Sequence, residues 1–360
     1  MQAVSEDRWI KFVWPLDKNS YAEHELDADS KGQGKSIKAR ELFSKIINGA
    51  WRNGEPGMVF LDRINEDNHV IQEYGPMIAT NPCGEQPLLG NESCNLGSIN
   101  LAKFFINKDI QFEDGDNLWK TRIDWDRLQK VTSLAVNFLD NVIDANEYAT
   151  WEIEEMTKAT RKIGLGVMGF ADLLIQLRIP YNSEIAREVA HGIIRHISAV
   201  ANEESLSLAV TRGEFPAFGK STFNPITEVY RNACRMTVAP TGTISMIAGC
   251  SSGVEPIFSL AFRKQNILEG KTLYYVDKNF EAIARERNFY SKDLLEFLSE
   301  GGSLQNRNDV PVDVKEIFKT APDISPENHV RMQAAFQKSV DAGISKTINW
   351  FVKNYEICRK

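Results

Sequence analysis

The spacing of apolar residues predicts amphipathic helices in several parts of the chain. Between residues 39 and 53, apolar side chains recur every three or four positions, and Gly54 ends the pattern. The same spacing returns over residues 128–142 and 185–200, and Ser183 stands where the second of these helices needs a capping residue. A later helix is predicted over residues 332–340.

Short apolar runs between these helices predict buried strands. Residues 58–61, 235–238 and 344–349 have the length and composition of strands, and turn-forming residues bound the first of them. Helices that alternate with such strands are typical of a parallel sheet. The sequence therefore predicts an α/β fold.

Composition and charge narrow the possible partners. The chain has 360 residues, is 42% hydrophobic, and carries a formal net charge of −7, so it can fill a large core but has no basic excess to neutralise nucleic-acid phosphates. No apolar run approaches the roughly 20 residues of a membrane span, and the first residues do not resemble a signal peptide. We expect a cytoplasmic protein that binds neither nucleic acid nor a membrane.

The cysteines and histidines indicate no metal site. The five cysteines lack the paired spacing of zinc ligands and are too few for a disulfide framework. The two helical histidines, His191 and His196, are five residues apart, which does not place them on one face for a shared metal. The cysteines are therefore candidates for catalytic or redox-active thiols.

The most informative segment is Asn81-Pro82-Cys83-Gly84-Glu85. Its proline and glycine disfavour regular structure, so three reactive side chains stand on one constrained loop. An amide can bind a hydroxyl, a thiol can act as a nucleophile or carry a hydrogen atom, and a carboxylate can accept a proton. Taken singly, each residue has an ordinary structural explanation, because buried cysteine packs as a small hydrophobe and these dipeptides form turns.

A second candidate segment, residues 238–245, combines an expected strand, a turn of small residues and a helix start. Backbone N–H groups at a helix start attract anions, and Thr241, Thr243 and Ser245 add hydroxyls. Alone, the pattern also fits a capped helix after a proline. The glycines of residues 163–169 imitate a dinucleotide fingerprint, but they lack a clear preceding strand, and we reject that interpretation.

Long strings in the sequence carry a family resemblance. NPCGEQPL followed by SCNLGSINL resembles the active-site segment of the catalytic subunit of ribonucleotide reductase. Further matching strings are WRNGEPG, RKIGLGVMG, APTGTI, SSGVEP, MQAAFQ and SKTIN. The resemblance covers nearly the whole chain, and the strings are most similar to those of class II reductases.

The resemblance implies a fold and a chemistry. The fold would be part of the ten-stranded α/β barrel of ribonucleotide reductase, with a finger loop that carries the radical cysteine. Cys83 would become a thiyl radical that removes the ribose 3′ hydrogen, Glu85 would take the proton of the 3′ hydroxyl, and Cys94 would supply reducing equivalents as half of a dithiol. The implied substrate contacts are Asn81, Pro82, Cys83, Gly84 and Glu85 at the sugar, and Pro240, Thr241, Gly242, Thr243 and Ile244 at the phosphates.

The resemblance also implies partners. Ribonucleotides, expected as ribonucleoside diphosphates, would be reduced to 2′-deoxyribonucleotides with adenosylcobalamin as radical source and a thioredoxin-like or glutaredoxin-like dithiol as reductant. Residues 1–349 would form a partial barrel and residues 350–360 a divergent ending that holds Cys358. No cysteine precedes Cys83 to pair with Cys94, so we expect a complementing chain with the N-terminal half.

Two alternatives remain open at this stage. The chain could belong to a class I catalytic subunit, which receives its radical from a separate subunit. It could also be a non-catalytic remnant, or a half-barrel that is active only with its complement.

Overall fold

The computed structural model describes residues 2–13, 33–106, 118–223, 228–267 and 271–348. It divides into two compact units, one of residues 1–59 with 351–360 and one of residues 60–350. The predicted boundary at residue 350 and the predicted ending with Cys358 lie outside the described residues.

The smaller unit is a hairpin followed by a helix. Its elements are α1 (Gln2–Ser5), β1 (Trp9–Val13), β2 (Gln33–Lys38) and α2 (Ala39–Asn53). The strands are antiparallel, and Lys38 Nζ lies 5.0 Å from the centre of the Trp9 ring. Helix α2 confirms the predicted helix, and it ends where Gly54 adopts a φ of 86°, a conformation that favours glycine.

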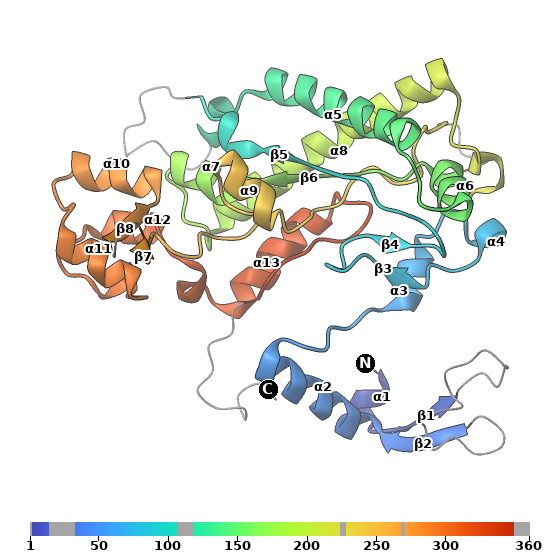
Figure 1. Cartoon of the computed structure of the whole chain (residues 1–360), viewed down its shortest axis with the longest axis horizontal. Helices are drawn as coiled ribbons and strands as arrows, with labels where there is room; N and C mark the ends of the chain where they lie inside the picture. The colour runs from blue at the N-terminus through green and yellow to red at the C-terminus, as the bar shows by residue number, and fades with distance from the viewer. Residues whose placement is uncertain (1, 14–32, 107–117, 224–227, 268–270, 349–360) are drawn as a thin grey trace. The chain divides into compact units, whose positions relative to one another are not determined.

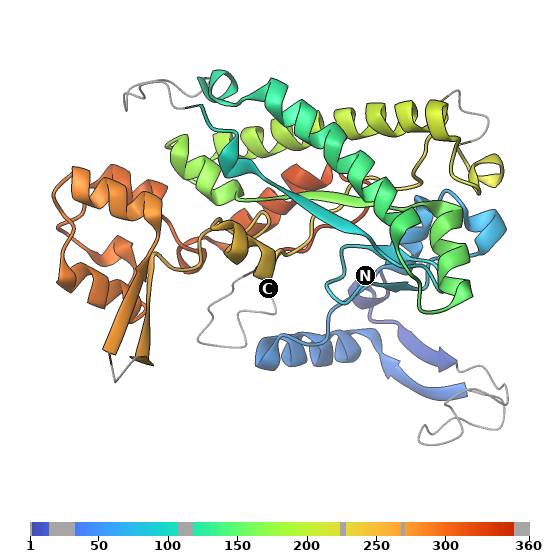
Figure 2. The same ribbon diagram turned by 45° about the horizontal axis from the view of Figure 1, so that its top comes forward.

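Parallel strands form the centre of the larger unit. Strand β5 (Leu96–Asn100) pairs with β6 (Gly164–Met168), with Leu96 opposite Gly164. Parallel bridges then join Leu165 to Met236 and Val238 to Ile344. Residues 235–238 therefore extend the row of strands, as the sequence predicted, whereas of residues 344–348 only Ile344 forms a bridge. Strands β5 and β6 run side by side in both views (Figures 1 and 2).

Helices that connect these strands bury them. They are α5 (Trp125–Ala145), α6 (Trp151–Thr160), α7 (Phe170–Gln176), α8 (Glu184–Arg212) and α13 (Pro326–Gln337). The predicted helices are confirmed in α5, α8 and α13, and the Ser183 side chain caps α8 by accepting from Ala186 N–H. Residues of α5, α8 and α13 share one hydrophobic cluster with the strands. Among the described residues, no helix is both long and apolar enough to cross a membrane.

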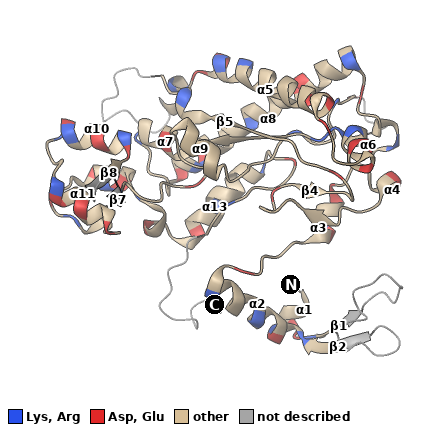
Figure 3. Ribbon diagram, viewed as in Figure 1, with Lys and Arg blue, Asp and Glu red and all other residues tan. Residues whose placement is uncertain are grey.

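A second apolar cluster lies around a hairpin and short helices. The elements are β7 (Ala261–Ile267), β8 (Lys271–Val276), α10 (Lys278–Glu286), α11 (Lys292–Ser299), η5 (Leu304–Asn306), α12 (Val312–Ile317) and η6 (Ala321–Asp323). The Phe280 and Phe318 rings meet edge to face with centroids 5.3 Å apart. Acidic and basic residues alternate on the outer faces of α10 and α11 (Figure 3).

One strand prediction is wrong. Residues 58–61 form no strand, and α3 (Leu61–Glu66) begins at the last of them. Met58, Val59, Phe60 and Leu61 are all more than 40% exposed. An apolar run becomes a buried strand only when another element covers it, and local composition does not contain that information. Asn349, the last residue of the predicted 344–349 strand, lies outside the described residues.

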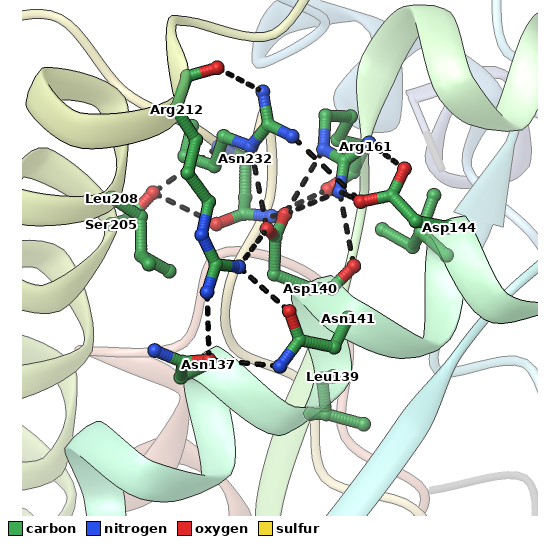
Figure 4. Close-up of polar contacts among 12 residues, drawn as sticks. Asn137, Leu139, Asp140, Asn141, Asp144, Arg161, Ser205, Leu208, Arg212 and Asn232 are labelled. Atoms are coloured by element: carbon green, nitrogen blue, oxygen red, sulfur yellow. Dashed lines mark hydrogen bonds and ion pairs between the residues drawn. The ribbon is translucent and has the colours of Figure 1, made fainter.

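A buried carboxylate joins several elements behind the strands. Asp140 on α5 is fully buried and accepts hydrogen bonds from Arg161, Arg212 and Arg231, with the shortest, from Arg161 Nη2, at 2.8 Å (Figure 4). Asn232 Nδ2 also donates to it, at 3.1 Å. These donors come from the end of α6, the end of α8 and the segment before residue 235. Asp140 therefore fixes the backbone that enters two of the parallel strands.

Replacing this carboxylate should destabilise the fold strongly. Asp140→Ala removes the carboxylate that the Arg161, Arg212 and Arg231 side chains share and leaves Arg161 with the Asp144 carboxylate alone, so the free energy of unfolding should fall by about 3–5 kcal/mol. Urea unfolding followed by circular dichroism measures the loss. Asp126→Ala, which removes an exposed carboxylate from the same helix, is the control and should change stability by about 1 kcal/mol or less. Equal effects of the two substitutions would contradict this role of Asp140.

Candidate active site

The NPCGE segment forms the tip of a short hairpin. Strands β3 (Ala79–Thr80) and β4 (Pro87–Leu88) are antiparallel and enclose residues 81–86. Asn81 closes the tip, because its N–H donates to Gln86 O at 3.0 Å and its Oδ1 accepts from Gln86 N–H at 2.9 Å. Gly84 has a φ of 86°, which a residue with a side chain rarely adopts. The constrained loop predicted from Pro82 and Gly84 is confirmed.

The tip exposes its thiol and buries its carboxylate. Cys83 is exposed, whereas Asn81 is 8% and Glu85 only 1% exposed. Glu85 Oε2 is buried and has no hydrogen-bond partner within the described structure. An unpaired buried oxygen costs about 1–3 kcal/mol, and a hydroxyl that reached it would remove that cost. Since Asn81 Oδ1 is already engaged, the amide Nδ2 is the group left to donate to a ligand.

The second thiol lies between two anchored neighbours. Cys94 is exposed, on the segment that leads from the hairpin into β5. Before it, Ser93 N–H donates to Thr157 Oγ1 at 3.2 Å. After it, Asn95 O accepts from Gly164 N–H at 2.8 Å. Backbone bonds on both sides therefore fix the position from which the Cys94 sulfur projects.

A buried ion pair anchors the same segment. The Glu92 and Lys162 side chains are 0% and 5% exposed, and Lys162 Nζ lies 2.8 Å from Glu92 Oε2. The carboxylate also accepts from Leu89 N–H at 2.9 Å and from the Thr160 hydroxyl at 2.6 Å. Both oxygens thus have partners, as a buried carboxylate requires. The pair joins the chain after the hairpin to the end of α6.

The pKa of the Cys94 thiol depends on the two other reactive groups. Burial raises the pKa of the Cys94 thiol, and the Glu85 carboxylate raises that pKa further because a nearby negative charge opposes formation of the thiolate. Cys83 acts in the same direction. The Cys94 thiol therefore lies within electrostatic range of both Cys83 and Glu85.

The predicted phosphate turn forms a short helix start. Thr241 has a φ of 56° and precedes α9 (Gly242–Ala248), so the predicted helix is present. Thr241 Oγ1 accepts from Gly253 N–H at 2.7 Å, which holds the turn. Gly242 and Thr243 are exposed, Ile244 is 46% exposed, and Pro240 is half-buried. The exposed hydroxyl at this turn is therefore that of Thr243.

The extended segment of residues 235–238 links the hairpin to the Thr241 turn. Glu85 O accepts a hydrogen bond from the Thr237 hydroxyl at 2.8 Å, and Thr241 follows four residues later. Four residues of extended chain span at most about 14 Å. The Thr241 turn therefore begins within this distance of the strand residue that holds the Glu85 backbone.

The other two described cysteines, Cys234 and Cys250, are less accessible than Cys83 and Cys94. Cys234 is buried, and burial raises the pKa of its thiol to about 12. Cys250 is partly buried, which also raises its pKa. Within the described ranges there is no cluster of three or more His, Cys, Asp or Glu residues that could hold a metal ion.

Comparison with known proteins identifies the family. A model described as the barrel domain of ribonucleotide reductase matches residues 4–229 and 224–358. The chain belongs to this family. It is 47% identical over 338 residues to a vitamin B12-dependent ribonucleoside-diphosphate reductase of Thermoplasma acidophilum, with 94% of the chain and 42% of the relative covered.

Two further relatives agree with this assignment. A reductase of the same name from Mycobacterium tuberculosis is 47% identical over 311 residues, covering 86% of the chain and 42% of the relative. The class Id ribonucleotide reductase alpha subunit of Actinobacillus ureae has the same fold, with a TM-score of 0.66, 24% identity, and 85% and 54% of the two chains covered. The predicted family and α/β barrel class are confirmed, and the chain spans less than half the length of its curated relatives.

Several residues that hold the site were not predicted. Thr237 and Gly343 bond to the backbone of Glu85, and Glu92 pairs with Lys162. Glu92 and Lys162 lie within or beside matching strings, but a charged residue in sequence looks like a surface residue. Only the tertiary fold reveals these four as supports of the loop.

Thiol accessibility tests this geometry. When the folded chain is treated with iodoacetamide at neutral pH, Cys83 and Cys94 should be alkylated while Cys234 is protected, because its buried thiol stays protonated. Peptide mass spectrometry measures the rate at each cysteine, and urea-unfolded chain, in which all of them react, is the control. A native Cys234 that reacted as fast as Cys83 would show that this arrangement is wrong.

Proposed function

We propose that the chain is part of a catalytic subunit that reduces ribonucleotides, as diphosphates, to 2′-deoxyribonucleotides. The observation that carries the proposal is that Cys83 and Glu85 share the tip of one hairpin and that both influence the Cys94 thiol. It agrees with the printed names of the relatives, which are ribonucleoside-diphosphate reductases.

Each group at the hairpin has a distinct role in this proposal. Cys83, as a thiyl radical, takes the 3′ hydrogen atom of the ribose, and an exposed sulfur at the tip can reach it. Glu85 Oε2, which lacks a partner, accepts the proton of the 3′ hydroxyl. Asn81 Nδ2 donates to a sugar hydroxyl. The 2′ hydroxyl takes a proton and leaves as water, and Cys83 returns the hydrogen atom to the 3′ carbon.

Cys94 takes part in the reduction itself. Two electrons and two protons are needed to replace the 2′ hydroxyl by hydrogen with loss of water, and a dithiol supplies them as it becomes a disulfide. Residues 1–82 contain no cysteine, so the second thiol of that dithiol would come from the complementing polypeptide. A thioredoxin-like or glutaredoxin-like protein in the cytoplasm would then reduce the disulfide.

The substrate phosphates would bind at the Thr241 turn. The exposed Gly242 and Thr243 offer backbone N–H groups at the start of α9, and Thr243 adds a hydroxyl. Pro240 and Ile244 would border the same anion. Thr241 follows Thr237, which bonds to Glu85 O, by only four residues, and this short separation supports a single substrate that spans both.

Adenosylcobalamin would supply the radical, as the names of the relatives suggest. A cavity of about 740 Å³ lies beside α9 and the β7–β8 hairpin. Met246, Phe258, Phe262 and Tyr275 line it, and all four are more than 40% exposed. These apolar side chains would pack against part of the corrin, and the rest of the cofactor would extend beyond this cavity. When bound, the cofactor provides an organic radical by homolysis of its cobalt–carbon bond.

A complementing polypeptide would cover the apolar surface of the barrel fragment. Leu134 and Phe138 lie one turn apart on α5 and are 69% and 64% exposed, and Val210 on α8 is 88% exposed. Apolar residues clustered on one helix face mark a surface that another segment buries. The relatives contain more than half of their length outside the matched region, and a chain carrying that part would supply the missing strands and thiol.

Reconstitution tests the proposal. The chain, combined with a polypeptide that carries the remaining part of a relative, should convert a ribonucleoside diphosphate to its deoxy product when cobalamin and a dithiol are added. Cys83→Ser should abolish the product. Cys94→Ser should permit radical formation but also yield no product, because the dithiol that supplies the two electrons is lost. Cys358→Ser is the matched control and should keep full activity. Product from the Cys83→Ser protein would overturn the assignment.

A further inference from the structure

The backbone of Glu85 is held by two residues from distant parts of the chain. Its carbonyl oxygen accepts from Gly343 N–H at 2.7 Å and lies 2.8 Å from the Thr237 hydroxyl, whose single hydrogen is shared with Gly343 O at 2.9 Å. Thr237 lies in the extended segment that pairs with β6, and Gly343 precedes the Ile344 bridge. The end of the hairpin is thus tied directly to two of the parallel strands.

These two donors are themselves immobilised. Thr237 is 1% exposed, and its N–H donates to Leu165 O at 3.1 Å. A Cβ at Gly166 would lie 2.3 Å from Thr237 O, so β6 packs directly on this backbone. Val238 N–H donates to Gly343 O at 3.1 Å and links the two donors to each other. The pair therefore acts as one rigid support.

Position 343 also requires the absence of a side chain. A Cβ there would lie 2.9 Å from Glu85 O and 3.0 Å from Glu85 Cα, closer than real contacts of this kind. Gly343 is not one of the glycines with a positive φ, so the lack of space for a side chain, and not the backbone conformation, explains the glycine. Any larger residue would push the Glu85 backbone away from its place.

We propose that Thr237 and Gly343 are positioning residues that set where the Glu85 carboxylate lies relative to Cys83 and Cys94. The backbone position of Glu85 sets the origin from which its side chain extends, and among the described residues no hydrogen bond to Oε2 holds the buried carboxylate instead. The inference deepens the proposed function, because it rests on the role of Glu85 at that site.

The Cys94 thiol reports the position of this carboxylate without any need for catalysis. Burial raises the pKa of Cys94 and the negative charge of Glu85 raises it further, so a carboxylate displaced away from the thiol should lower that pKa and speed alkylation at neutral pH. In a Cys83→Ser background, the pH dependence of Cys94 alkylation, followed by peptide mass spectrometry, gives the thiol pKa.

Thr237→Val tests the hydroxyl. It keeps the shape of the side chain but removes the donor, so the Cys94 pKa should fall toward its value in Glu85→Gln. Thr237→Ser keeps the hydroxyl and should restore the original pKa. The matched control is Thr132→Val, which removes the hydroxyl of a buried threonine on α5 that bonds to Leu128 O, and it should leave the Cys94 pKa unchanged.

A double-mutant cycle separates an effect on the position of Glu85 from a general loss of structure. If Thr237 acts through Glu85, Thr237→Val should produce no further shift in a Glu85→Gln background. Gly343→Ala should behave in the same way and provides a second route should the valine variant fail to fold. An equal shift with and without the Glu85 charge would overturn the inference, as would a Cys94 pKa that does not respond to Glu85→Gln.

The outcome is separable from that of the proposed function. If the cycle behaves as expected but the reconstituted protein makes no deoxyribonucleotide, the positioning role stands and the proposed reaction fails. If product forms but Thr237→Val leaves the Cys94 pKa unchanged, the reaction stands and the positioning role fails.

Discussion

A loop that presents reactive groups needs a fixed base, and here that base is the carbonyl oxygen of Glu85. Two donors, Gly343 N–H and the Thr237 hydroxyl, bond to this one atom from adjacent extended segments. The tip beyond it is stabilised by its own turn, which Asn81 closes on Gln86. The exposed Cys83 can therefore project from the sheet while the carboxylate two residues later stays buried beside it.

Buried polar groups extend this support behind the site. The Glu92–Lys162 pair fixes the chain that returns from the hairpin, and Asp140 gathers three arginines where the chain enters the strands. Such groups lose solvation when buried, and they persist because each has several partners. Hydrophobic packing of α5 and α8 supplies the bulk of the core, whereas these polar bonds specify where the backbone around the two thiols lies.

The sequence predicted the features that depend on neighbouring residues. Helices α2, α5 and α8 follow from local apolar spacing and caps, and the constrained tip follows from Pro82 and Gly84. Residues 58–61 were predicted wrongly because nothing local says whether an apolar run is covered. The bond between Thr237 and Glu85 joins residues 152 positions apart, so no local pattern could reveal it.

The most direct test is a crystal structure of the chain, joined by its complementing polypeptide, with a ribonucleoside diphosphate bound. The account predicts the ribose 3′ carbon within about 4 Å of Cys83 Sγ, the separation at which reacting atoms meet, and the 3′ hydroxyl hydrogen-bonded to Glu85 Oε2. A nucleotide bound elsewhere, with the Glu85 oxygen still unpaired, would contradict it.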